Sequence, residues 1–139
     1  MASLEEAIRD SIKELEGIKS NLILAYEATL YDIGGELVYH TPIDTGLASS
    51  NWNVTNSDRS EPVKEPYGFE KGKASLDAIQ DQIKKLKLGS DVIYYNPVDY
   101  IDDLEGGSSK RQAAMGMIKP TELRINGLWV QNLEYFKVI

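Results

Sequence analysis

The stretch SLEEAIRDSIKELEGIKSNLILAYEATLYDIGGEL, residues 3–37, decides the fold of this chain. Its apolar residues recur every three or four positions, as on one face of an α-helix: Leu4, Ile8, Ile12, Leu15, Ile18, Leu22, Tyr26, Leu30, Ile33 and Leu37. Ser3 and Glu6 have the spacing of a capping box, so we expect the helix to begin there. We expect the Gly34-Gly35 pair to bend or break it.

A helix of this length extends about 50 Å, which is more than the core of one small domain covers. Its middle is therefore expected in the chain's own core. Its ends either continue an amphipathic core helix or contact a neighbouring subunit.

The helix must stop by Thr41, because the backbone before Pro42 disfavours helical geometry. Residues 41–46 then have the composition of a tight turn. Apolar and polar residues alternate from Ser50 to Thr55, which predicts a half-buried strand. Residues 56–72 are rich in Ser, Pro, Gly and charge, and are expected to form a long mobile loop or arm.

A second helix is predicted over residues 76–86, with Gly89 as its stop signal. The β-branched and aromatic residues 92–95 predict a strand, and residues 100–105 a short helical turn. Residues 121–133 fit either a helix, whose apolar face continues to Phe136, or a hairpin around Asn126-Gly127. We favour the helix.

These elements predict one α+β domain over residues 1–139, with a long N-terminal helix and a C-terminal helix packed on a small, mostly antiparallel sheet. Two obvious strands are few for a stable sheet. Either residues 107–117 or neighbouring subunits are expected to add strands.

Composition excludes several classes of function. The chain has 42% hydrophobic and 27% charged residues, an ordinary globular balance. Its net charge of −7 opposes sequence-independent nucleic-acid binding. It has no cysteine and one histidine, His40, so we expect no metal site, no catalytic triad and no cofactor. No apolar run is long enough for a membrane span or a signal peptide, so we expect synthesis in a cytoplasm.

Asp44-Thr45-Gly46 spells the signature of aspartic proteases, which need two carboxylates that share a proton. One copy per chain would require a homodimer. The motif follows a long helix rather than ending a strand, and β signals cover little of the chain. We therefore expect no enzyme and no catalytic residues, with the homodimeric protease and a generic protein-binding adaptor as alternatives.

Two stretches together carry a family resemblance. The first is TPIDTGL (41–47) followed by NWNV (51–54), and the second is GSDVIYYNPVDYIDDLEGGS (89–108) running to Gly116-Met117. In this order they resemble the head–tail joining, or neck and tail-completion, proteins of long-tailed bacteriophages. Those proteins share "P-x-D-T-G" after a long helix, then "N-W", and later "Y-x-x-x-L-E-x-G-x-S-x-Q-A-P-x-G-M". Here Ala114 replaces the proline, and Arg111 lengthens the loop by one residue.

The resemblance implies a structural subunit of the virion neck or tail, made in the host cytoplasm, that forms a homo-oligomeric ring. Its partners would be other neck, connector or tail-tube proteins, with DNA only as cargo passing through the lumen and no membrane. The turn and core would be fixed by Pro42, Asp44, Thr45, Gly46, Asn51, Trp52 and Asn96. Subunit or partner contacts would come from Tyr100, Leu104, Glu105, Gly107, Ser108, Gln112, Met115 and Met117.

Overall fold

The computed structural model describes residues 3–43, 46–106 and 116–139. Its elements are α1 (Leu4–Tyr39), the 3-10 helix η1 (Ala48–Ser50), β1 (Asn53–Thr55), α2 (Lys73–Ile83), β2 (Ile93–Tyr95), α3 (Ile101–Glu105), α4 (Ile118–Glu122) and α5 (Ile125–Tyr135). The predicted α+β class, with long terminal helices and a small antiparallel sheet, is confirmed.

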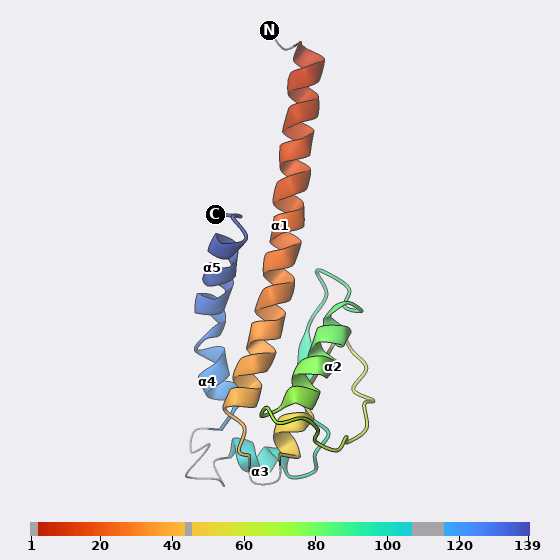
Figure 1. Cartoon of the computed structure of the whole chain (residues 1–139), viewed down its shortest axis with the longest axis vertical. Coiled ribbons are helices and arrows are strands. Elements are labelled where there is room, and N and C mark those ends of the chain that lie inside the picture. The colour runs from red at the N-terminus through yellow and green to blue at the C-terminus, as the bar shows by residue number, and fades with distance from the viewer. Residues whose placement is uncertain (1–2, 44–45, 107–115) are drawn as a thin grey trace.

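Helix α1 runs along most of the length of the molecule (Figure 1) and has 36 residues, or about 54 Å at the standard rise. The predicted capping box is present, because the Glu6 N–H donates to Ser3 Oγ and the Ser3 N–H donates to Glu6 Oε2, both at 3.2 Å. The helix ends at Tyr39, before Pro42, as expected.

Helix α1 continues unbroken through the glycine pair, so the predicted break was wrong. A Cβ on Gly34 would lie 2.7 Å from Ile79 Cδ1, whereas a Cβ on Gly35 would meet nothing within 4 Å. Gly34 therefore allows α2 to pack closely against α1, and this packing holds the helix together across a weak point in its sequence.

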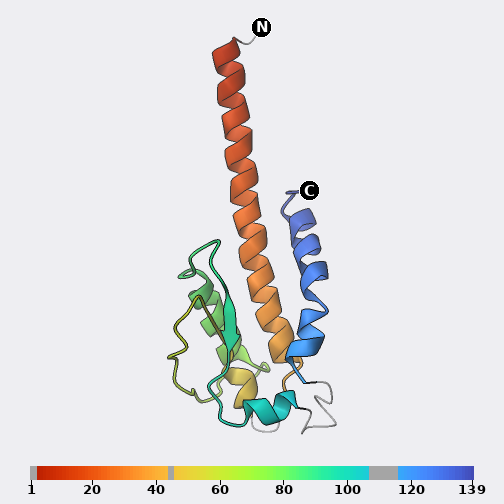
Figure 2. The same cartoon turned by 180° about the vertical axis from the view of Figure 1, so that it is seen from behind.

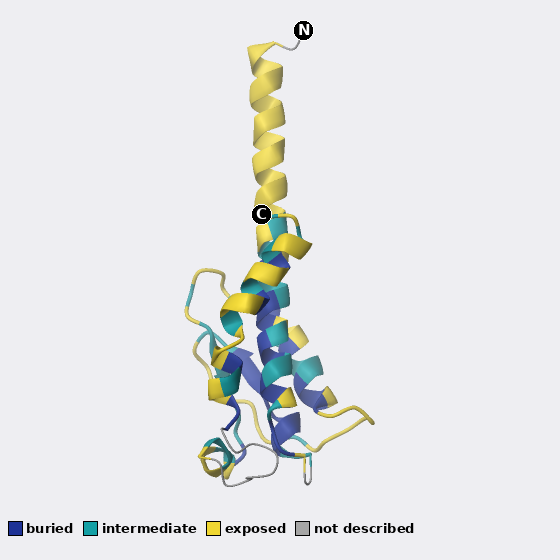
Figure 3. Cartoon of the chain, turned by 90° about the vertical axis from the view of Figure 1, so that its left-hand side faces the viewer, coloured by how far each residue is buried: buried dark blue, intermediate teal, exposed yellow. Residues whose placement is uncertain are grey.

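Helices α4 and α5 lie along one side of α1, and α2 with the sheet lies along the other (Figures 1 and 2). The core forms between them. It contains Leu30, Leu37, Val38, Trp52, Val54, Ile79, Ile83 and Met117. Figure 3 shows that burial is confined to the lower half of α1, whereas its N-terminal half is exposed all round.

The C-terminal segment is helical, which confirms the helix over the hairpin, although it divides into α4 and α5 at Leu123 and Arg124. Polar groups bind α5 to α1, because Asn132 Nδ2 donates to Thr29 Oγ1 at 3.0 Å and to Asp32 Oδ2 at 2.9 Å. Asn132 and Thr29 are both buried. These hydrogen bonds fix the register of the two helices.

The sheet pairs β1 with β2 in antiparallel orientation, with Val54 opposite Tyr94. The Tyr94 hydroxyl donates to the Leu30 carbonyl of α1, and burial raises the pKa of this hydroxyl far above its ordinary value. Tyr94 therefore joins the sheet to α1 as a protonated donor. Within the described residues the sheet has only these two strands.

Candidate assembly surfaces

The turn after α1 is held by a buried tryptophan at the end of the body opposite the N-terminus. Trp52 is 3% exposed, and its Nε1–H donates to Thr41 Oγ1 at 2.9 Å. Thr41 Oγ1 donates in turn to the Leu37 carbonyl in the last turn of α1. Pro42 is buried, whereas Asp44 and Thr45 lie outside the described residues. This chain of hydrogen bonds fixes where the polypeptide leaves α1.

Gly46 resumes the described chain in the left-handed region, at φ +74°, where residues other than glycine are strained. Its carbonyl accepts from the Ser50 N–H at 3.1 Å. Asn96, after β2, donates from Nδ2 to the Ala48 carbonyl at 2.8 Å and accepts from the Val98 N–H at 3.1 Å. The segment after the turn is thereby bound to the chain that follows β2.

Asn51 connects the body to the long segment 56–72. Its Nδ2 donates to the carbonyls of Leu47 and Lys64 at 2.8 and 2.9 Å, and its Oδ1 accepts from the Lys64 N–H at 2.7 Å. The Glu61 N–H also donates to the Tyr95 hydroxyl at 3.2 Å. Residues 56–72 contain no helix or strand, as expected, and the side chains of Asn51 and Tyr95 hold their main chain at these two points.

The predicted strand is present as β1, but Asn51 and Asn53 are both 0% exposed, so the expectation that only the apolar side of this stretch is buried was wrong. Helix α2 explains the difference. Gln82 Nε2 donates to Asn53 Oδ1, and Gln82 Oε1 accepts from the Val54 N–H, both at 2.8 Å. The strand therefore keeps its polar side chains inside, because polar partners are supplied there.

Ser75 and Gln82 are site residues that the sequence analysis missed. Ser75 Oγ accepts from the Trp52 N–H at 2.8 Å and donates to the Ser49 carbonyl at 2.6 Å. The missed signal was their spacing, since both lie three or four residues from Ile79 and so share its buried side of α2. Polar residues within an apolar helix face indicate a buried hydrogen-bond network.

Glu105 fastens the end of α3 to the start of α4. Its Oε1 accepts from the main-chain N–H groups of Met117 and Ile118 at 2.8 and 2.9 Å. Gly116 lies beneath it at φ +78°, and a Cβ there would lie 2.5 Å from the Glu105 carbonyl oxygen. The carboxylate and the glycine together bring Glu105 and Gly116 side by side.

The other predicted contact residues fall into three groups. Tyr100 is exposed, and Leu104 packs against the core. Met117 is 0% exposed in the core, so it is a packing residue and not the contact residue that we predicted. The apolar side chain faces inward because the Glu105 hydrogen bonds turn the chain at this point. Gly107, Ser108, Gln112 and Met115 lie outside the described residues.

The opposite end of the molecule carries a different surface, the N-terminal half of α1. Every residue from 3 to 20 is exposed. The predicted apolar face continues through this half, with exposed fractions between 41% and 77% at Leu4, Ile8, Ile12, Leu15, Ile18 and Leu22. We call these six residues the N-terminal stripe. An apolar row of this length on a monomer indicates an interaction surface.

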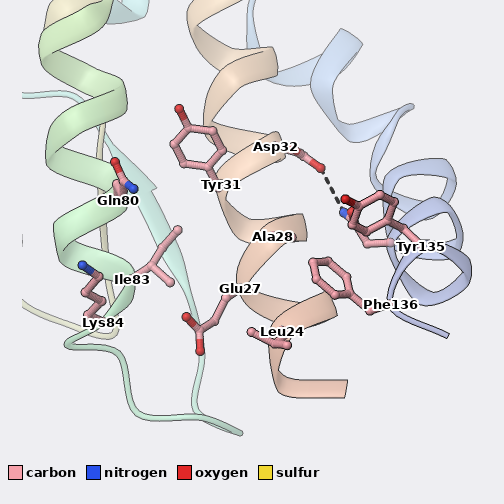
Figure 4. Close-up of a pocket in the computed structure, with 11 residues that line it drawn as sticks. Leu24, Glu27, Ala28, Tyr31, Asp32, Gln80, Ile83, Lys84, Tyr135 and Phe136 are labelled. Atoms are coloured by element: carbon pink, nitrogen blue, oxygen red, sulfur yellow. Dashed lines mark hydrogen bonds between the residues drawn. The ribbon is translucent and has the colours of Figure 1, made fainter. Parts of the chain in front are cut away.

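A groove of about 470 Å³ lies between α1, α2 and α5 (Figure 4). Tyr31 and Phe136 line it beside the hydrogen bond from Asn132 to Asp32. The charged Glu27 and Lys84 stand at its α1 and α2 sides. The groove is open and its polar groups do not converge on one point, so it has the character of a packing seam.

The single histidine and the acidic side chains are the groups that catalysis or metal binding would require. His40 Nε2 lies 3.4 Å from Glu36 Oε2 of the same helix. No three His, Asp or Glu side chains within the described ranges are arranged to hold a metal ion. The chain on either side of the Asp44-Thr45 pair, residues 41–43 and 46–50, belongs to no strand. None of the helices described here is both long and apolar enough to cross a membrane.

Comparisons with protein-family models, with curated proteins and with solved structures found no match to this chain. The function is therefore inferred from the residues of this chain and from their geometry.

Proposed function

We propose that this protein is a structural, ring-forming subunit of the neck or tail-completion region of a tailed bacteriophage, which joins the head to the tail. The observation that carries the proposal is the N-terminal stripe, because a single copy leaves six large apolar side chains in water. A chain that acts alone gains nothing from this exposure. A chain that works as one of several copies buries it.

The arrangement of the molecule supports a joining role over the alternatives. The N-terminal stripe lies at one end of the molecule, and helix α3 lies at the other (Figure 1). The two ends can therefore make different contacts, the stripe with other copies of the chain and the opposite end with a neighbouring structure. The sequence resemblance to phage neck proteins adds the class of partner, namely connector or tail-tube proteins in the virion, with DNA passing through the lumen.

We assign no catalytic role to the Asp44-Thr45-Gly46 signature. An aspartic protease would present this aspartate at the end of a strand, in a β-rich fold. Here the motif follows a 36-residue helix, and the described sheet has two strands of three residues each. We assign this motif the role of a turn between α1 and η1, as the composition of residues 41–46 indicates.

Deletion of the gene from its phage, followed by electron microscopy of the lysate, tests the proposal. We expect DNA-filled heads and separate tails, and we expect the purified protein to restore joined particles when it is added to that lysate. Asp44→Asn is the control against the protease, because it keeps a turn-forming side chain and abolishes acid–base chemistry. Normal joined particles without the protein would overturn the proposal.

A further inference from the structure

The N-terminal stripe is ordered like the contact face of a parallel coiled coil. Apolar residues that alternate at steps of three and four define positions a and d of a seven-residue repeat. In this stretch, position a holds Ile8, Leu15 and Leu22, and position d holds Leu4, Ser11 and Ile18. Ser11 is the one polar member. The sixth stripe residue, Ile12, stands beside the row at position e and widens it.

Charged residues on the flanks of the row match a second copy of the same helix. In parallel helices, position g of one copy faces position e of the next repeat in its neighbour. Glu14 is at g and Lys19 is at the following e, so opposite charges meet between copies. Ala7 at g and Ile12 at e form the preceding pair, which is apolar. Both pairs are complementary.

An antiparallel pair is less well matched. In the register that overlaps the whole stripe, Glu14 faces Glu14 of the second copy, and Ser11 faces Leu15. This arrangement keeps only the attraction between Lys19 and Glu5. The parallel arrangement avoids the like-charge pair and aligns the two Ser11 hydroxyls in one layer.

The fold supplies a reason why the contact would end near Leu22. On the C-terminal side of Leu22, the same face of α1 is covered by the chain's own α5, through Thr29 and Asn132. Tyr26 packs edge-on against Trp129 of α5, with ring centroids 6.5 Å apart. On the N-terminal side of Leu22, nothing in the described chain covers this face of α1. The face that α5 fills inside one subunit is thus open to another helix over residues 4–22.

We infer that the N-terminal stripe binds the same stripe of a neighbouring copy, with the helices parallel and Glu14 of one copy paired with Lys19 of the next. Leucine at a with isoleucine at d, as in Leu15, Ile18 and Leu22, favours assemblies of more than two helices. The inference deepens the proposed ring, and it concerns how the subunits hold one another. In a ring, each helix presents its g side to one neighbour and its e side to the other.

A charge-swap series on the full-length protein tests the inference by sedimentation equilibrium at low salt, with circular dichroism to confirm folding. Leu15→Asp should weaken self-association by roughly 100-fold or more, because it places a charge in the apolar row. Glu14→Lys and Lys19→Glu should each weaken it about threefold, as expected for one exposed pair. The double variant should return to the wild-type value. Glu16→Lys and Lys13→Glu carry the same charge changes on the outer side of the helix and should leave association unchanged.

Three results would overturn the inference: a wild-type protein that stays monomeric at all concentrations, a Leu15→Asp variant that associates normally, or a double variant that does not recover. The outcome is separable from the fate of the proposed function. A monomeric Leu15→Asp variant that still joins heads to tails would refute the self-contact and leave the neck role standing. If the charge-swap variants behave as expected but deletion of the gene still leaves joined particles, the self-contact stands and the neck role is refuted.

Discussion

The two halves of α1 share one apolar periodicity and have opposite surroundings. From Ala25 to Val38 the helix lies between α2 and α5, and seven of its residues are buried. From Ser3 to Ser20 no residue is buried at all. The same pattern of leucine and isoleucine therefore indicates a core in one half and a surface in the other. Periodicity alone identifies a face to be covered, and the length of the helix decides whether its own chain can cover it.

The halves should differ most when a large apolar side chain is removed. Ile79→Ala deletes the α2 side chain that packs on Gly34, and should cost about 2–5 kcal/mol of unfolding free energy because it leaves a cavity. Leu15→Ala should change the stability of the monomer by less than about 0.5 kcal/mol, since no contact is lost. Urea unfolding at low protein concentration measures both. Equal losses would show that the halves are not distinct.

A smaller loss is expected for Asn51→Ala, which removes three hydrogen bonds to main-chain groups. We expect a cost of about 2 kcal/mol, because the carbonyl of Leu47 and the main chain of Lys64 lose their partner. Segment 56–72 should also be cut faster by proteases around Lys64, since the two hydrogen bonds that hold its main chain there are gone. Limited proteolysis followed by mass spectrometry measures the cut site. Unchanged cleavage would place the attachment elsewhere.

Two glycines offer a matched pair across the halves. A Cβ at Gly35 or at Gly17 meets nothing within 4 Å, so alanine fits both sites. Gly35→Ala should raise the global unfolding free energy by about 0.5–1 kcal/mol, because helical alanine is favoured over glycine. Gly17→Ala should increase helicity with no change in the main thermal transition. A rise in melting temperature for Gly17→Ala would link the N-terminal half to the cooperative unit.

The smallest effect is expected at the distal cap. Ser3→Ala removes the acceptor of the Glu6 N–H, and cap loss typically costs about 1 kcal/mol locally. The first turn of α1 should then exchange its amide hydrogens faster, while the unfolding midpoint of the body stays the same. Hydrogen exchange detected by NMR resolves this difference. Faster exchange in the buried half would contradict the separation of the two halves.

The elements whose residues make local patterns were predictable from the sequence. The capping box, the periodicity and Pro42 predicted α1, which begins at Leu4 after its N-cap Ser3 and ends at Tyr39. The apolar face that reaches Phe136 predicted a helix at the C-terminus. Features that depend on packing were not predictable. Helix α1 continues through Gly34 because Ile79 of α2 packs against this glycine. The burial of Asn53 depends on a hydrogen bond from Gln82, 29 residues away.

The candidate site was predictable only in part, because some of its contacts also depend on packing between distant residues. The resemblance selected Trp52, Asn96 and Glu105, whose contacts are now described. It also selected Met117 as a contact residue, although the side chain is in the core. The side chain of Met117 faces the core because of the direction in which the chain turns before α4. That direction depends on the hydrogen bonds that Glu105 accepts from two N–H groups twelve and thirteen residues along the chain. No pattern of neighbouring residues carries that information.

The long α1 also determines how a single copy moves through solvent. A compact chain of 139 residues has a radius of gyration of about 14 Å. This helix alone is about 54 Å long, and half of it stands clear of the body. Hydrodynamic friction is therefore high for the mass, so the monomer should elute early from a gel-filtration column, at the position of a larger globular protein. Light scattering gives the true mass, because the scattered intensity at a given weight concentration follows molecular weight and does not depend on drag.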